Sequence, residues 1–150
     1  MRPRYSPFNF VRRFFVFCFF LLALPGCLFA RLGDYSDTIE DVDGGLVARK
    51  LQDDGTVGIF YHKDHYLYFV IFDRDTSISE RYSRFDGKDL SQNEITRFLR
   101  GNAGRAMTWH PVAASASEER NFERSDHKAE ATVARVVDRL VLTVRRIGGK

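Results

Sequence analysis

The sequence is poor in cysteine, with only two among its 150 residues. Cys18 lies inside an apolar run, and Cys27 follows that run directly after Pro25 and Gly26. No cysteine occurs after Cys27, so the rest of the chain cannot form a disulfide within itself. That part of the chain must depend on its hydrophobic core for stability.

The first 26 residues contain no acidic side chain, although they carry Arg2, Arg4, Arg12 and Arg13. These arginines account for the formal net charge of +3. Without this segment the basic residues fall from 23 to 19, against 20 acidic residues. The remainder is therefore close to neutral, and we expect no basic patch and no nucleic-acid partner.

Long hydrophobic runs are also absent. Residues 14–24 form an apolar run of eleven, well below the roughly 20 residues that a membrane-spanning helix needs. A cationic stretch, a short apolar run and a small-residue site together indicate a secretory signal. The end of the run resembles the lipobox of bacterial lipoproteins, with Leu24 at −3, Gly26 at −1 and Cys27 as the lipid-bearing residue. Pro25 departs from the small residues usual at −2.

This resemblance implies that residues 1–26 are a signal peptide and that Cys27 carries diacylglycerol and palmitate. Residues 27–33 would then be a lipidated tether and residues 34–150 a single domain. In Gram-negative lipoproteins an Asp after the cysteine favours the inner membrane, so Leu28 implies the outer membrane, facing the periplasm. Two alternatives stay open: an uncleaved anchor helix over residues 8–30, or cleavage by the ordinary signal peptidase.

The remaining sequence predicts an α+β fold: a small antiparallel sheet of β-meander type with two helices packed on it. A capping box from Ser91 to Glu94 begins the stronger helix, and we expect Gly101 to end it. No internal repeat is evident. The expected helices cover residues 34–42 and 91–100, and the expected strands cover residues 46–51, 57–61, 66–72, 76–85, 107–112, 122–124, 129–136 and 140–145.

Motifs for catalysis or cofactor binding are lacking: the sequence has no Gly-x-Ser-x-Gly elbow and no glycine-rich phosphate loop. His62 and His65 could ligate zinc, but a hairpin between two strands explains them as well, and no third ligand has a recognisable spacing. Asp73 and Asp75 could bind a divalent cation, but the sequence around them lacks the extended acidic loop and the closing Glu of a calcium site. We therefore expect no catalytic residue, no metal site and no cofactor, and a protein that is not an enzyme.

Residues 66–72 form the most strongly β-prone segment, and it is apolar on both faces. Tyr66 and Tyr68 fall on one face, and Leu67, Phe69 and Ile71 on the other. We expect this strand to be central. If both helices cover the Leu67 face, Tyr66 and Tyr68 stay partly open and form a surface for a partner.

The start of the expected domain resembles the BamE (SmpA/OmlA) family of outer-membrane assembly lipoproteins. Gly33, Ile39 and Gly44 match the spacing of that family's Gly, Val and second Gly, whereas Tyr35 replaces its Thr and Leu46 its Pro. The resemblance covers less than a third of the chain. It implies an interaction protein without catalysis.

The leading hypothesis is therefore a lipid-anchored cell-envelope protein, held at the membrane by lipid, that binds another envelope protein. The alternative is a periplasmic binding module for a small molecule or glycan that uses the aromatic sheet face.

Overall fold

The computed structural model describes residues 31–113 and 118–148; Leu24, Gly26 and Cys27 lie outside this range. No helix in the described part is long and apolar enough to span a membrane. The first half contains α2 (Ser36–Asp43), β1 (Gly45–Leu51), β2 (Val57–Lys63), β3 (Tyr66–Asp73) and β4 (Thr76–Arg84). The second half contains α3 (Gln92–Ala103), β5 (Trp109–Val112), β6 (Arg120–Arg124), β7 (Ala129–Val136) and β8 (Arg139–Arg146).

The eight strands form one antiparallel sheet in the order β1-β2-β3-β4-β8-β7-β6-β5. Within the described residues, each half consists of one helix followed by a four-stranded meander, and the last strands of the two halves pair in the middle of the sheet. The α+β prediction is confirmed, and β3 is an interior strand as expected. The repeated arrangement was not visible in the sequence.

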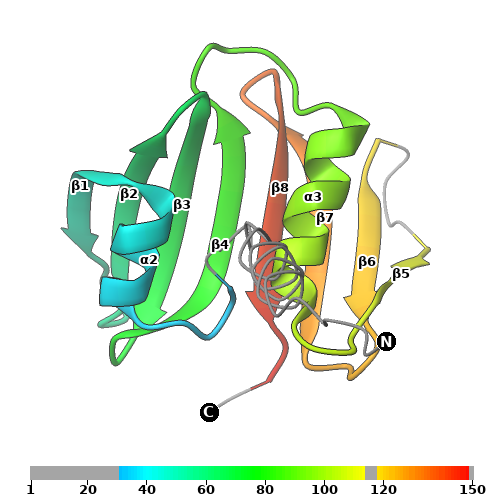
Figure 1. Ribbon diagram of the computed structural model, residues 1–150, viewed down its shortest axis with the longest axis horizontal. Helices are drawn as coiled ribbons and strands as arrows, with labels where there is room; N and C mark the ends of the chain where they lie inside the picture. The colour runs from blue at the N-terminus through cyan, green and yellow to red at the C-terminus, as the bar shows by residue number, and fades with distance from the viewer. Residues whose placement is uncertain (1–30, 114–117, 149–150) are drawn as a thin grey trace, which may run out of the picture.

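Both helices lie on the same face of the sheet, α2 over the first meander and α3 over the second (Figure 1). Directly opposed residues of an antiparallel sheet share a face, and one such row contains Tyr61, Tyr68, Tyr82 and Leu142, all buried beneath the helices. The Phe98 ring of α3 stacks on Tyr82 with centroids 4.5 Å apart. The hydrophobic core therefore fills the space between the helices and this face.

The capping box of α3 is present as predicted, with Ser91 and Glu94 bonding to each other's backbone N–H. The prediction that Gly101 ends the helix is wrong, because α3 continues to Ala103. Tertiary contacts satisfy carbonyls of its last turn: the Trp109 Nε1 donates to the Leu99 carbonyl at 2.6 Å, and Arg124 donates to the Asn102 carbonyl at 3.3 Å.

The two glycines of the family motif lie on either side of α2. Gly33 and Gly44 adopt φ of +100° and +92°, which favours glycine. A Cβ at Gly44 would approach the His62 carbonyl oxygen to 2.6 Å. The N-cap is Tyr35, the residue at the motif's Thr position, and its side chain makes no capping bond. The matched glycines therefore fit a role in ending and positioning the helix.

Candidate docking face

The face of the sheet opposite the helices is not covered by any helix or strand of residues 31–113 and 118–148 (Figure 1). Its composition changes across the sheet. One row of opposed residues on this face begins with Phe60 and Phe69 and continues through Arg81, Thr143 and Thr132. Along this row, the uncovered face is apolar over β2 and β3 and polar over β4, β8 and β7.

We define the open apolar patch as Phe60, Leu67, Phe69 and Ile71, all half-buried. The Phe60 and Phe69 rings stack with centroids 4.4 Å apart. Gly58 makes this arrangement possible, because a Cβ there would lie 2.8 Å from the Phe69 ring. The close packing of the patch therefore depends on a glycine in β2, and its residues are in contact with one another.

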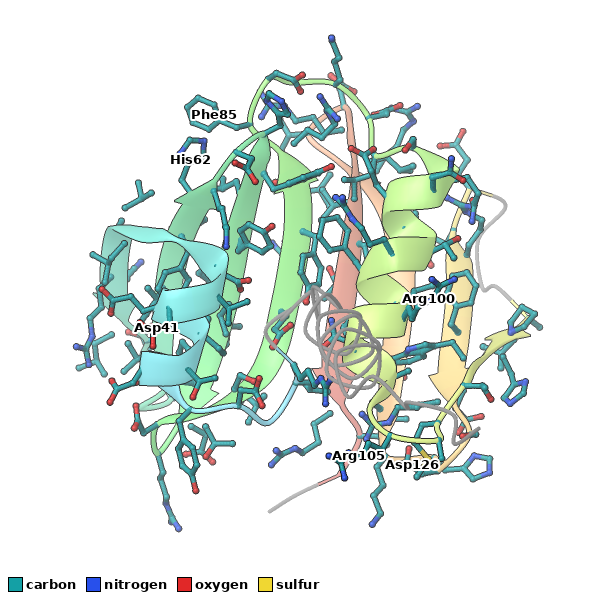
Figure 2. The ribbon with its side chains drawn as sticks, in the orientation of Figure 1. Asp41, His62, Phe85, Arg100, Arg105 and Asp126 are labelled. Carbon is teal, nitrogen blue, oxygen red and sulfur yellow. The ribbon has the colours of Figure 1, made fainter. Side chains whose placement is uncertain are left out.

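Polar and charged groups border the open apolar patch. The Arg81 guanidinium lies 5.8 Å from the centroid of the Phe69 ring, within the range of a cation–π contact. At one end the His62 ring lies 4.6 Å from that of Phe85, which is 63% exposed, and Figure 2 shows the two side by side. The buried Nε2 of His62 has no hydrogen-bond partner in the described part of the chain. An apolar centre with a polar border is the usual composition of a protein–protein contact surface.

The expectation that Tyr66 and Tyr68 form the open surface is wrong. Tyr68 is 6% exposed, and the Tyr66 hydroxyl donates to Glu94 of α3 at 2.6 Å. The helices cover the tyrosine face, and the Leu67 face is the open one. The register explains the outcome, because Phe69 lies opposite Arg81, a charged residue that could not be buried unpaired beneath a helix.

The two histidines of the sequence motif lie in the β2–β3 hairpin. His62 belongs to β2, whereas His65 lies in the turn before β3. No group of three or more His, Cys, Asp or Glu side chains suited to a metal occurs in the residues that the structure describes.

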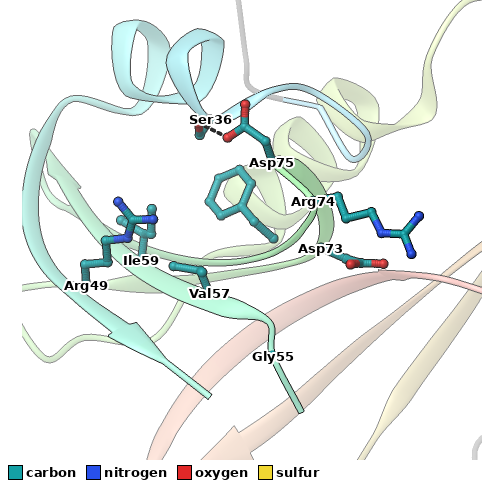
Figure 3. Close-up of a pocket in the computed structure, with 9 residues that line it drawn as sticks. Ser36, Arg49, Gly55, Val57, Ile59, Asp73, Arg74 and Asp75 are labelled. Atoms are coloured by element: carbon teal, nitrogen blue, oxygen red, sulfur yellow. Dashed lines mark hydrogen bonds between the residues drawn. The ribbon is translucent and has the colours of Figure 1, made fainter. Parts of the chain in front are cut away.

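A polar hollow of about 520 Å³ lies beside the β3–β4 turn (Figure 3). Asp73 and Asp75 reach it from the turn, and Asp75 accepts a hydrogen bond from the Ser36 hydroxyl at the start of α2. Asp75 therefore helps to join α2 to the turn.

A second hollow, of about 340 Å³, lies between α3 and the strands β5 and β6. It is lined mainly by apolar groups, including Leu99, Met107, Trp109 and Phe122. Arg100 of α3, labelled in Figure 2, also lines it. Its chemistry suits an apolar ligand with a negative end.

A buried polar cluster lies between the two helices, on the covered face of β4. Glu80 is 1% exposed and accepts hydrogen bonds from the Tyr82 and Ser77 hydroxyls. Asn102 of α3 donates to the Tyr82 oxygen at 2.5 Å and accepts from the Leu32 N–H at 2.9 Å. The cluster therefore joins β4, α3 and residues 31–33, which the sequence assigned to the tether.

Two carboxyl groups in this region have raised pKa values. Burial raises the pKa of Glu80 to about 7, although its hydrogen bonds to Tyr82 and Ser77 oppose the change. Burial, together with the nearby charge of Glu80, raises the pKa of Asp43 to about 8. The Oδ2 of Asp43 is buried and has no partner among the described residues. Folding is therefore expected to depend on pH.

The sequence did not show that Phe60 stacks with Phe69 on the open face, and it did not identify Glu80 as buried. Gly58 was an available signal, because a glycine inside an apolar strand often marks a close approach of another group to the backbone. No comparable signal existed for Glu80, which occupies an ordinary position in a polar strand segment.

Comparison with models of protein families, with curated proteins and with solved structures gives no match.

Proposed function

We propose that this chain is a lipid-anchored cell-envelope protein that docks another envelope protein on the uncovered sheet face and performs no catalysis. The observation that carries the proposal is the open apolar patch, with its stacked Phe60 and Phe69 rings. A contiguous apolar area on a surface otherwise rich in charge favours a contact with another protein.

The N-terminal sequence supports the proposed anchor and location. Leu24, Gly26 and Cys27 fit a lipobox, and Leu28 favours the outer membrane with the domain facing the periplasm. The resemblance of the first helix region to the BamE family supports outer-membrane assembly or maintenance as the setting. A covalent lipid would hold the docking face near its partner at high local concentration.

A small-molecule or glycan binding module is the second candidate. The stacked Phe60 and Phe69 rings offer a platform for a sugar, and the hollow beside Trp109 offers an apolar pocket. We favour a protein partner because the patch extends over two strands and is bordered by polar residues, whereas ligand sites are usually concave.

The anchor is tested by labelling. We expect the full chain, expressed in bacteria with labelled palmitate, to incorporate label, and Cys27→Ser to incorporate none, because the thiol is the group that accepts the lipid. Equal label in both proteins, or a mature product that retains residues 1–26, would contradict lipidation at Cys27.

The docking surface is tested by replacing Phe60 and Phe69 together with Thr, which suits a strand but removes the apolar stack. We expect stability to fall by about 1–2 kcal/mol, since both rings are half-buried, and chemical crosslinks to a partner in cells to be lost.

Val133→Ala is the matched control, because it removes buried apolar area on the covered face without touching the patch. It should lose comparable stability and keep its crosslinks. Loss of crosslinks in both variants would assign the effect to instability, and retention in both would exclude this patch as the docking surface.

A further inference from the structure

The two edges of the sheet differ in how they are protected. An edge strand exposes backbone N–H and C=O groups that can pair with another strand. β5 has only four residues, and one of them is Pro111, which has no N–H to donate. β1 has seven residues and no proline, and it pairs with β2 on one side only.

β1 is exposed along its whole length. Its large apolar side chains include Leu46, Val47 and Leu51, which are 49%, 58% and 69% exposed. In Figure 1, α2 lies in front of the sheet and does not extend past β1 to cover its outer edge. Its backbone is therefore available to an incoming strand.

The charged residues of β1, Arg49 and Lys50, are both basic. Arg49 and Lys50 are adjacent, so their side chains point to opposite faces: Arg49 lies opposite Ile59 on the covered side, and Lys50 opposite Gly58 on the open side. Neither side chain has a hydrogen bond or ion pair within residues 31–113 and 118–148, and β1 contains no acid. Figure 3 shows Arg49 extending beside the polar hollow.

We propose that β1 is a strand-addition site for an extended segment of a partner protein that carries two adjacent acidic residues between apolar ones. Backbone pairing supplies the affinity, and one acid on each face of the added strand meets Arg49 and Lys50. This site is the backbone edge of β1, next to the open apolar patch, where Ala48 lies opposite Phe60. The site does not depend on the lipid anchor.

A second copy of this chain fits the edge less well. Antiparallel self-pairing of all seven residues would be centred on Ala48, so the two copies of Arg49 would become diagonal neighbours at roughly 7–8 Å with no acid between them. The register irregularity between Leu46 and Ala48, together with Lys50, also opposes pairing with a like strand. The partner is therefore expected to be an acidic segment.

The test uses the full chain in detergent and a nine-residue probe peptide with a central Glu-Asp pair between Val and Thr residues. One control peptide carries Lys-Lys in place of Glu-Asp, and a second has N-methylated backbone amides. Fluorescence anisotropy measures binding, and hydrogen exchange measures protection of residues 45–51. We expect the acidic peptide to bind and to protect β1, and both control peptides to bind at least tenfold more weakly.

Charge reversal supplies the matched variants. Arg49→Glu with Lys50→Glu should weaken binding of the acidic probe at least tenfold and favour the Lys-Lys peptide. Arg139→Glu with Arg146→Glu, an equal charge change at exposed positions, should have little effect. The proposal is overturned if the acidic peptide does not bind, if all peptides bind equally, or if the chain alone forms a dimer with β1 already protected.

Discussion

Replacement of Glu80 by Gln is expected to stabilise the protein by about 3 kcal/mol at pH 8 and to leave it nearly unchanged at pH 4. Glu80 is 1% exposed, and burial raises its pKa from 4.5 to about 7. Gln can replace the protonated acid: its carbonyl accepts from the Tyr82 hydroxyl as Glu80 does, and its amide donates to the Ser77 oxygen once the Ser77 hydroxyl donates to the Arg31 carbonyl. The variant therefore keeps the hydrogen bonds and removes the buried charge.

The direction follows from proton linkage. Below pH 4.5 the carboxyl is protonated in both the folded and the unfolded chain, so its ionisation has no effect on stability. As the pH rises from 4.5 to 7 the unfolded chain loses the proton first, and the free energy of unfolding falls. Above pH 7 the free energy of unfolding falls no further. The total decrease is about 1.4 kcal/mol for each unit by which folding raises the pKa.

Urea titrations at pH 4, 6 and 8 measure this effect in the wild type, in Glu80→Gln and in Glu40→Gln. Glu40 is an exposed glutamate on α2 and serves as the matched control. The wild type should lose stability from pH 4 to 8, and Glu40→Gln should follow it. A Glu80→Gln variant that is less stable than wild type at pH 8 would show that the ionised carboxylate stabilises the fold.

Replacement of Phe98 by Ala is expected to reduce the free energy of unfolding by about 3–5 kcal/mol, since it leaves a cavity where α3 meets the sheet. The Phe98 side chain is 1% exposed. Its ring stacks on Tyr82 at 4.5 Å and meets the edges of Tyr66 and Tyr68 at 5.1 and 6.2 Å.

Phe85→Ala is the control for this change, because Phe85 is 63% exposed and should cost less than about 1 kcal/mol. Thermal and denaturant unfolding of both variants measure the difference. Similar losses in the two variants would contradict the assignment of Phe98 to the core that joins α3 to the first meander.

Local signals in the sequence predicted most of the secondary structure. The Ser91 capping box and the unbroken β-prone run of residues 66–72 reflect forces that act within one element, so a single segment shows them. The end of α3 could not be predicted this way. It depends on Trp109 and Arg124, which come from later strands and bond to its last carbonyls.

The candidate site was harder to predict, because residues 66–72 are apolar on both faces and the segment alone does not show which face the helices cover. The decision depends on register: pairing with β4 places Tyr68 opposite Tyr82 and Phe69 opposite Arg81. The sequence shows which residues are present, but it does not show which residues of β3 and β4 lie opposite each other. The choice of Tyr66 and Tyr68 as the open surface failed for this reason.

The central claim is that the uncovered sheet face docks another protein in the cell envelope. The most direct measurement places the photoreactive residue benzoylphenylalanine at position 69, in the open apolar patch, or at position 41, on the outer side of α2, in the full chain in living bacteria. Phe69 belongs to the patch, and Asp41 is exposed on the opposite side of the sheet (Figure 2). We predict a discrete crosslinked protein with the probe in place of Phe69 and none with the probe in place of Asp41. Equal crosslinking at the two positions, or none at position 69, would contradict the account.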